Sequence, residues 1–357
     1  TSYGYQTWDE PSEDHIVDIV APEGVTVTIA RDALGKALSI TRSGAGGGAS
    51  ATRRYVYDAH ERLCKTVEPE SGATVQAYDA AGNLAWRGSG QAFPGPGCET
   101  QVAGSTLVSY GYDTRNRLTT TSYGDGSQNI TRSYTPDGLL AGIATSGGGV
   151  NPITWAYSYN NHRLLTQERY TWGDPNNGWN FDWGRDAHGH VSSLADPWGT
   201  VHYAPDALGR PTQVSGYASG VSYHPSGALA GYTLANGLGY AMTPNLRGLP
   251  ELMQQGGVVR DRYAYDANGN VTAITDETPG GINSRSMTLY DGLDRLRQAT
   301  GPWGAGSFDY DALDNLTGST VGGRSLTHHI DAATNRLTGF SGSQSLGIAY
   351  DANGAEV

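Results

Sequence analysis

One seven-residue pattern, Tyr-Asp-x-x-Gly-Arg/Asn-Leu, recurs over almost the whole chain. About fifteen copies follow one another at a mean spacing of about 23 residues, which indicates a repeat array rather than two or three ordinary domains. We therefore expect a single array over residues 1–357, with residues 1–30 as its weakest match. The clearest copies begin at Tyr57, Tyr78, Tyr112, Tyr265, Tyr290, Tyr310 and Tyr350. Weaker copies begin at Arg31, Tyr134, Tyr159, Arg185, Pro205, Tyr223 and Ile330, with a degraded one near Met242.

Each part of the pattern predicts a piece of a β-hairpin. Aromatic residues alternate with other residues before the turn, as in Tyr55 and Tyr57, which is the period of a strand. Asp can accept backbone N–H groups in a turn, and Gly adopts the left-handed conformation that closes it. Asn116, Asp294 and Asp314 tolerate that conformation in place of Gly, whereas Glu61 fits poorly. The residues given this structural role are Tyr57, Asp58, Tyr78, Asp79, Gly82, Tyr112, Asp113, Tyr265, Asp266, Gly269, Tyr290, Asp291, Tyr310, Asp311, Tyr350 and Asp351.

A second turn signal falls midway between the motifs, as in Glu68-Pro69-Glu70-Ser71-Gly72 and Gly301-Pro302-Trp303-Gly304. Each repeat then holds two strands and two turns. The chain contains 51 Gly and 16 Pro, and its aromatic residues are 22 Tyr and 8 Trp beside only 4 Phe, so long helices and a large apolar core are not expected. We predict an all-β fold, a continuous antiparallel meander of about thirty short strands.

The repeated motif resembles the rearrangement hotspot (Rhs) or YD-repeat family, which includes bacterial polymorphic toxins and the C subunits of insecticidal toxin complexes. The resemblance covers nearly the whole chain. It implies that the hairpins form a curved or spiralling strip, part of a hollow shell that encloses a toxin or other cargo domain. It also implies a bacterial protein that is secreted or displayed at the cell surface. The first residue is Thr1, without an initiator Met or a leader, so we expect a piece of a longer product.

The function that this resemblance implies is structural, a wall segment whose partners are the neighbouring repeats and the cargo domain of the same protein. The family's core-terminating segment with its self-cleaving aspartates has no counterpart near Asp351, so no catalytic residue and no enzyme activity are assigned. The alternative is an adhesin-like module that binds glycans or a receptor through exposed aromatic side chains. The densest aromatic cluster, Tyr170, Trp172, Trp179, Phe181 and Trp183, is the candidate patch, although packing over a longer hairpin is the preferred explanation for it.

Several classes of function are disfavoured. The net charge of −12 argues against a nucleic-acid partner, and no apolar stretch reaches the length of a membrane span. His188 and His190 would share one strand face, with His202 or His328 and His329 as further ligands, but the spacing of a zinc site is missing. Asp266-Ala-Asn268-Gly-Asn270 resembles a calcium loop only in part, and the hairpin turn accounts for it. We expect neither a metal nor a cofactor.

The two cysteines, Cys64 and Cys98, are 34 residues apart in the sequence, about one and a half repeats. A disulfide between them is attainable in a meander and suits a secreted protein; two unrelated thiols are the alternative. The strand edges lead to a second expectation. A strip cut from an array leaves an unpaired strand at each end, and the repeat around Tyr350 carries no protecting Lys or Pro, so we expect head-to-tail self-association.

Overall fold

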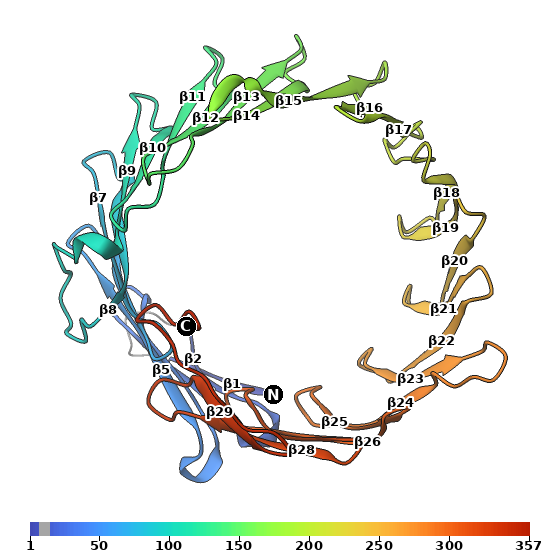
Figure 1. The fold of residues 1–357 in the computed structure, drawn as a ribbon. Coiled ribbons are helices and arrows are strands. Elements are labelled where there is room, and N and C mark those ends of the chain that lie inside the picture. Colours follow the sequence, from blue (N-terminus) through green and yellow to red (C-terminus); the bar gives the residue numbers. More distant parts are fainter. Residues whose placement is uncertain (7–14) are drawn as a thin grey trace. The chain divides into compact units, whose positions relative to one another are not determined.

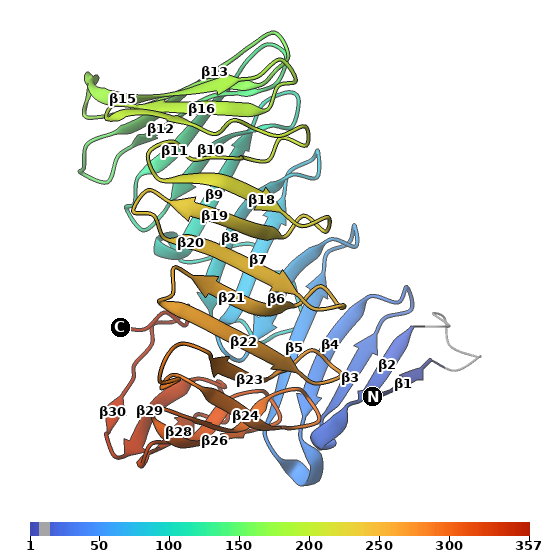
Figure 2. The ribbon, with the colours of Figure 1, turned by 90° about the vertical axis from the view of Figure 1, so that its right-hand side faces the viewer.

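The computed structural model describes residues 1–6 and 15–357, and this part of the chain contains thirty strands and no α-helix. The strands belong to one 17-stranded sheet and one 13-stranded sheet. Consecutive strands pair antiparallel, as the alternating pattern predicts. Figure 2 shows this meander plainly in the hairpins from β18 to β22. The all-β meander expected from the sequence is confirmed.

The first sheet follows the order of the sequence through seventeen strands. They are β1 (Ser2–Tyr5), β2 (Ile16–Val20), β3 (Thr26–Arg31), β4 (Ala37–Ser43), β5 (Ser50–Tyr57), β6 (Leu63–Glu68), β7 (Gly72–Tyr78), β8 (Leu84–Gln91), β9 (Leu107–Tyr112), β10 (Leu118–Tyr123), β11 (Asn129–Tyr134), β12 (Leu140–Ser146), β13 (Ile153–Tyr159), β14 (Leu165–Trp172), β15 (Asp174–Arg185), β16 (Val191–Asp196) and β17 (Gly199–His202). Three short 3-10 turns, η1 (Pro22–Gly24), η2 (Ala45–Gly47) and η3 (Gly104–Thr106), lie between them.

The second sheet holds the remaining thirteen strands in sequence order. They are β18 (Ala218–Tyr223), β19 (Leu229–Leu234), β20 (Gly239–Pro244), β21 (Pro250–Gln255), β22 (Val259–Tyr265), β23 (Val271–Asp276), β24 (Arg285–Tyr290), β25 (Leu296–Gly301), β26 (Gly304–Tyr310), β27 (Leu316–Val321), β28 (Arg324–Ile330), β29 (Leu337–Gly342) and β30 (Leu346–Gly347).

The chain divides into two compact units. Unit 1 contains residues 1–108, 265–273 and 285–357, and unit 2 contains residues 109–264 and 274–284. Unit 1 therefore unites the first eight strands with the last seven, and Figure 1 shows them side by side as blue and red ribbons. Unit 2 is formed by one consecutive run of repeats and a short segment that comprises the end of β23 and the loop before β24.

The interior is thin in both units. Few large apolar side chains in the described residues are fully buried, and the best buried of them is Val75. The Leu residues that start the return strands, such as Leu63 and Leu296, are half-buried rather than buried, because a single sheet layer covers only one of their sides. Stability must therefore depend heavily on polar contacts between neighbouring hairpins, and these contacts lie at the turns.

Candidate functional site

The Asp of each clear motif closes its own turn, as the turn at Asp58 illustrates. Its Oδ1 accepts hydrogen bonds from the backbone N–H groups of His60 and Arg62, both at 2.9 Å. The backbone adds a bond from the N–H of Asp58 to the Arg62 carbonyl. The same side-chain arrangement recurs at Asp79, Asp113, Asp291, Asp311 and Asp351, and Asp266 Oδ1 accepts from the N–H groups of Gly269 and Asn270. We call this unit a YD turn.

Several weaker copies keep these bonds, Asp32, Asp186 and Asp206 with the same carboxylate and others with a different side chain. Asn160 and Asn245 accept the two backbone N–H groups with their amide oxygens, and Thr135 accepts the bond from Leu139 N–H with its hydroxyl. At the fifth position, Gly82 and Gly269 have the positive φ expected of them. The local turn chemistry therefore extends through copies that look degraded in the sequence.

The Arg or Asn at the sixth position binds the second carboxylate oxygen of the same Asp. Arg62 Nε donates to Asp58 Oδ2 at 2.9 Å, and Arg117 Nε donates to Asp113 Oδ2 at 2.7 Å. In three Asn copies the amide nitrogen takes this role, at Asn83, Asn270 and Asn315. These donors favour the ionised carboxylate. Hydrogen bonds from the backbone N–H and side chain of Arg62 lower the pKa of Asp58 to about 2. The side chain of Arg117, followed by its backbone N–H, lowers the pKa of Asp113 to about 2.

The Tyr of most motifs donates its hydroxyl to a backbone carbonyl of the preceding repeat. Tyr78 Oη donates to the carbonyl of Leu63, the residue after the previous YD turn, at 2.8 Å. A register shift between Ala77 and Tyr78 accompanies this contact, and such bulges re-aim a side chain. The same bond to the preceding repeat is made by Tyr57, Tyr134, Tyr159, Tyr223, Tyr290 and Tyr350.

Two copies carry Arg in place of this Tyr and make the equivalent contact. Arg31 donates through Nε and Nη2 to the carbonyl of Ile16, and Arg185 donates to that of Leu165. The substitution therefore preserves the bond to the preceding hairpin. The sequence signals this role only in part, since Arg31 and Arg185 keep a long side chain with a terminal donor, whereas Pro205 and Ile330 in two other weak copies do not.

The sixth-position cation also covers the Tyr ring of the next repeat. Arg62 lies over Tyr78 at 4.6 Å from the ring centroid, and Arg117 lies over Tyr134 at 4.4 Å. Four further repeats show the same contact, through Lys36, Arg210 and Arg295 at the sixth position and through Arg336, which follows a turn that is one residue longer. One Arg thus holds its own turn by an ion pair and the next hairpin by a cation–π contact. We call this chain of contacts the turn ladder.

Four of the non-glycine residues with positive φ add a second bond between repeats. Glu61, at φ 63°, accepts a hydrogen bond from Lys36 of the preceding repeat at 2.8 Å. Asp294, Asp314 and Asn335 accept equivalent bonds from the sixth-position residues Asn270, Arg295 and Asn315. Glu61 is therefore not an anomaly of turn sequence, because its carboxylate forms a contact between repeats that Gly could not make.

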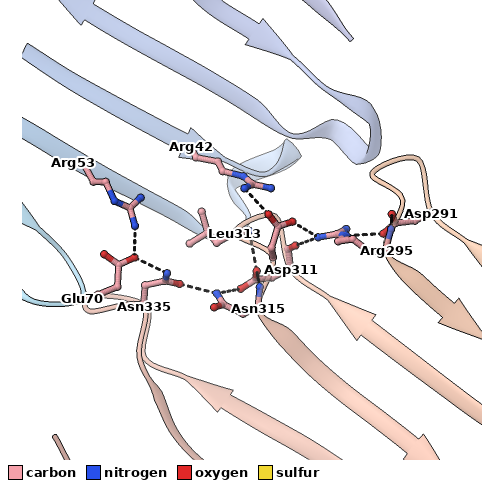
Figure 3. Close-up of polar contacts among 10 residues, drawn as sticks. Arg42, Arg53, Glu70, Asp291, Arg295, Asp311, Leu313, Asn315 and Asn335 are labelled. Atoms are coloured by element: carbon pink, nitrogen blue, oxygen red, sulfur yellow. Dashed lines mark hydrogen bonds and ion pairs between the residues drawn. The ribbon is translucent and has the colours of Figure 1, made fainter. Parts of the chain in front are cut away.

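Unit 1 also joins repeats that are far apart in the sequence, along a line that we call the seam (Figure 3). The N–H of Gly292 donates to Glu23 Oε1 at 2.9 Å, and Arg42 Nη1 pairs with Asp314 Oδ2 at 2.6 Å. Asn335 Nδ2 donates to Glu70 Oε1 at 2.8 Å.

The seam has a regular register. The intermediate turns at residues 22–24, 44–48 and 68–72 meet the YD turns at 291–295, 311–315 and 331–336 in the same order. Close approach requires glycine at two of these contacts. A Cβ on Gly292 would lie 2.6 Å from Pro22 Cβ, and one on Gly44 would lie 2.8 Å from Ala312 Cβ. The seam is thus a one-to-one contact between two different kinds of turn.

Figure 3 shows that the seam and the turn ladder form connected polar networks. Glu70 accepts bonds from both Arg53 and Asn335, and Asn335 in turn accepts one from Asn315. Asp314 likewise contacts both Arg42 and Arg295. Each of the two acidic side chains therefore links the early strands to the late ones.

The two cysteines join the long segment of residues 92–106, which we call the excursion, to the first sheet. Cys64 in β6 and Cys98 form a disulfide with a Cα–Cα separation of 5.6 Å. Beside it the fully buried Lys65 pairs with Glu99 at 3.1 Å. A Cβ on Gly88 would lie 2.8 Å from Val102, so the same excursion packs tightly on β8. The segment from residue 92 to 106 consequently covers the best-buried part of unit 1.

The candidate aromatic patch is assembled only in part. Tyr170, Trp172 and Trp179 are in ring contact, and Trp155 and Trp198 join them. Trp183 is not among these ring contacts, and its buried Nε1 has no acceptor in the described residues. Phe181 lies opposite Glu168 in the ladder of β14 and β15.

The histidines and the partial calcium motif are occupied with local contacts. His190 Nδ1 lies 3.1 Å from Asp186 Oδ2, within a YD turn, and Asp266 closes a turn of its own. His202, His328 and His329 lie on β17 and β28, and the part of the chain that the structure describes contains no group of three or more His, Cys, Asp or Glu able to hold a metal ion. Among the described residues no helix is long and apolar enough to cross a membrane.

Comparison with known proteins places this fold. No family model matches the sequence, and no curated protein matches it. A structure of the Photorhabdus luminescens Tc holotoxin pore is similar with a TM-score of 0.61 and 14% identity, over 93% of this chain and 21% of that one. The crystal structure of TcdB2-TccC3-Cdc42 is similar with a TM-score of 0.58 and 14% identity, over 87% of this chain and 20% of that one. The crystal structure of TcdB2-TccC3 without its hypervariable C-terminal region has a TM-score of 0.58 and 15% identity, over 93% of this chain and 20% of that one.

The chain has the fold of a Tc toxin segment. It spans about a fifth of the length of the solved chains that it matches. At 14–15% identity this similarity concerns the fold. The fold and the repeated motif point in the same direction, since insecticidal toxin complexes are among the proteins that the motif resembles.

Proposed function

We propose that this chain is a non-catalytic wall segment of an Rhs or YD-repeat protein, in which the repeats enclose a toxin or other cargo domain for delivery. The cargo domain and the neighbouring repeats of the same protein would be its partners, and secretion or surface display its destination. The observation that carries the proposal is the seam. Repeats about 270 residues apart meet turn against turn in register, which is what a continuous wall needs where the strip lies against itself.

The chemistry of the turns supports a structural role. The conspicuous Asp and Arg side chains satisfy the turn backbone and one another, as at Asp58 and Arg62. Acidic groups that serve as general acids or bases usually have pKa values raised toward neutrality, whereas the pKa of Asp58 and that of Asp113 are held near 2. These groups are suited to holding hairpins together.

Protease protection of the cargo tests the proposal. The full gene product that contains this chain is digested before and after denaturation of the repeats, and cargo fragments are followed by mass spectrometry. Protection by the intact repeats is the expected result. Equal digestion of the cargo with intact and unfolded repeats would overturn the proposal. A double variant, Glu70→Ala with Arg42→Ala, removes two seam contacts and is expected to expose the cargo to protease sooner than the wild-type protein does.

A further inference from the structure

Five aromatic rings of unit 2 form a continuous row, which we call the aromatic row. It consists of Trp155, Tyr170, Trp172, Trp179 and Trp198. The centroid of Tyr170 lies 5.4 Å from that of Trp155 and 5.9 Å from that of Trp179. Trp179 lies 5.0 Å from Trp172 and 5.6 Å from Trp198. The row therefore runs without a break from β13 to the turn between β16 and β17.

The strand register places these rings on one face of the sheet. Trp155 on β13 is directly opposite Tyr170 on β14, and Tyr170 is directly opposite Trp179 on β15. Trp172 follows Tyr170 by two residues and so shares its face. Successive rings thus advance across neighbouring strands rather than along one strand. The result is an aromatic surface several strands wide.

One end of the row is open to solvent. Trp198 is 75% exposed and Trp179 is 38% exposed, whereas the other three rings are partly buried. A second turn of the same kind shows that such exposure is not required by the turn itself. In Gly301-Pro302-Trp303-Gly304 the Trp303 ring is 42% exposed, well below Trp198, and covers the Gly301 backbone, where a Cβ would lie 2.7 Å from it. Trp198 instead stands on another tryptophan with most of its surface in water.

The backbone that carries the exposed rings is held in place before any ligand binds. Asp196 Oδ1 accepts hydrogen bonds from the N–H groups of Trp198 and Gly199. Arg169 donates to Asn180 Oδ1 and to the Pro175 carbonyl, which fixes the start of β15. Ligand binding to fixed rings costs little ordering entropy. Exposed aromatic side chains on a rigid support are typical of a recognition surface.

The chemistry around the row selects among ligands. Asn176, Asn177 and Thr200 are exposed in the segments next to Trp179 and Trp198 and offer uncharged donors and acceptors. Asp174, also exposed, and the net charge of −12 disfavour anionic ligands such as nucleic acids or acidic lipid surfaces. Indole faces attract the weakly positive C–H faces of sugar rings through the negative face of the π-system. Neighbouring amides suit the hydroxyl groups of sugars.

From this combination we propose that the aromatic row is a binding platform for an extended, uncharged glycan. The sugar rings would lie on Trp198 and Trp179, and the hydroxyl groups would bond to the adjacent amide and hydroxyl side chains. The site does not depend on the wall function, because it uses side chains that take no part in the turn ladder or the seam.

Binding of neutral hexasaccharides to the intact chain tests the proposal. Cellohexaose, chitohexaose and maltohexaose are titrated by calorimetry and by tryptophan fluorescence, followed by an array of neutral plant, fungal and animal glycans. We expect binding to at least one of them. Trp198→Ala and Trp179→Ala are each expected to weaken it by about tenfold or more. Trp303→Ala is the matched control, because it removes a tryptophan from the same kind of turn outside the row, and it should leave affinity unchanged.

Folding of the variants is checked by circular dichroism and thermal unfolding. Trp198→Ala is expected to fold normally because its side chain is mostly exposed. Absence of binding to every neutral glycan would overturn the proposal, as would equal binding by wild type and Trp198→Ala. Binding to anionic vesicles or to a protein receptor in place of neutral glycans would overturn it as well. None of these outcomes bears on the protease protection that tests the wall.

Discussion

Glu70 and Asn335 are joined by a hydrogen bond of 2.8 Å although 265 residues separate them. Glu70 Oε1 also accepts a bond from Arg53, so one carboxylate holds both sides of the seam. Replacement by Ala leaves both donors without this partner, and a hydrogen bond to a charged group contributes about 1.5–3 kcal/mol. We expect Glu70→Ala to raise hydrogen exchange in the turn at residues 331–336.

Glu68→Ala is the control for the seam. Glu68 lies in the same intermediate turn, 3.7 Å from Arg53 Nε, and accepts a bond from Ser71, but its described contacts do not reach the late repeats. Glu68→Ala should therefore leave hydrogen exchange at residues 331–336 unchanged. Equal exchange in the two variants would mean that Glu70 does not hold the seam.

The hydroxyl of Tyr290 tests the turn ladder. It donates to the Val271 carbonyl at 2.6 Å, and Tyr290→Phe removes only this donor. We expect a loss of about 0.5–1.5 kcal/mol in the free energy of unfolding, measured by urea denaturation. Tyr310→Phe is the matched control, because the described contact of Tyr310 is with Arg295 through its ring. If both variants lost the same stability, the hydroxyl bond would not be what couples the repeats.

Acid should weaken the YD turns within a defined range of pH. Asp58 and Asp113 have folded-state pKa values of about 2, below the ordinary value of 3.8. Their contribution to stability is therefore complete above about pH 4 and is lost as the pH falls toward 2. Carbon-13 NMR of the carboxyl groups and thermal unfolding between pH 2 and 5 measure this. The variant Asp58→Asn has no carboxylate to protonate at this position, so its melting temperature should fall less than that of the wild-type protein between pH 5 and pH 2. A titration of Asp58 near 3.8 would contradict the role given to Arg62.

Two substitutions of Glu61 distinguish the effect of backbone strain from the effect of its side-chain contact with Lys36. The substitution Glu61→Gly removes the conformational strain of a non-glycine residue at φ 63°. It also removes the ion pair with Lys36, which contributes less than about 1 kcal/mol because the Glu61 carboxylate is 59% exposed. The two effects nearly cancel, so Glu61→Gly should change stability by less than about 0.5 kcal/mol. Glu61→Val keeps the strain for a β-branched residue and should cost about 1–3 kcal/mol. Denaturant unfolding measures the stability of both variants. Equal losses of stability would show that the contact with Lys36, and not backbone strain, determines the effect of Glu61.

The strands and turns were predictable because their causes are local. The Asp at position two satisfies N–H groups two and four residues later, as Asp58 does, and alternation marks the strands on either side. The contacts between repeats were not predictable in this way. Tyr78 reaches a carbonyl 15 residues back, and only the bulge before it shows why it can. The seam joins turns that lie about 270 residues apart in the sequence, and no short segment determines its register. The positive φ of Glu61 makes sense only once Lys36 is placed beside it.

The disulfide between Cys64 and Cys98 fixes the excursion over β6–β8. Closing a loop of 34 residues stabilises by about 3–4 kcal/mol in the chain-entropy model, and the bridge also holds Glu99 near the buried Lys65. We expect the double variant Cys64→Ala and Cys98→Ala to unfold at a lower denaturant concentration and to be cleaved by protease within residues 92–106. Glu99→Gln, which keeps the bridge but removes the charge partner of Lys65, should weaken unit 1 without exposing that segment to the same extent. Thiol titration of the denatured, unreduced protein should find no reactive thiol. Two thiols per chain, or unchanged protease resistance in the double variant, would show that the excursion is held by its packing alone.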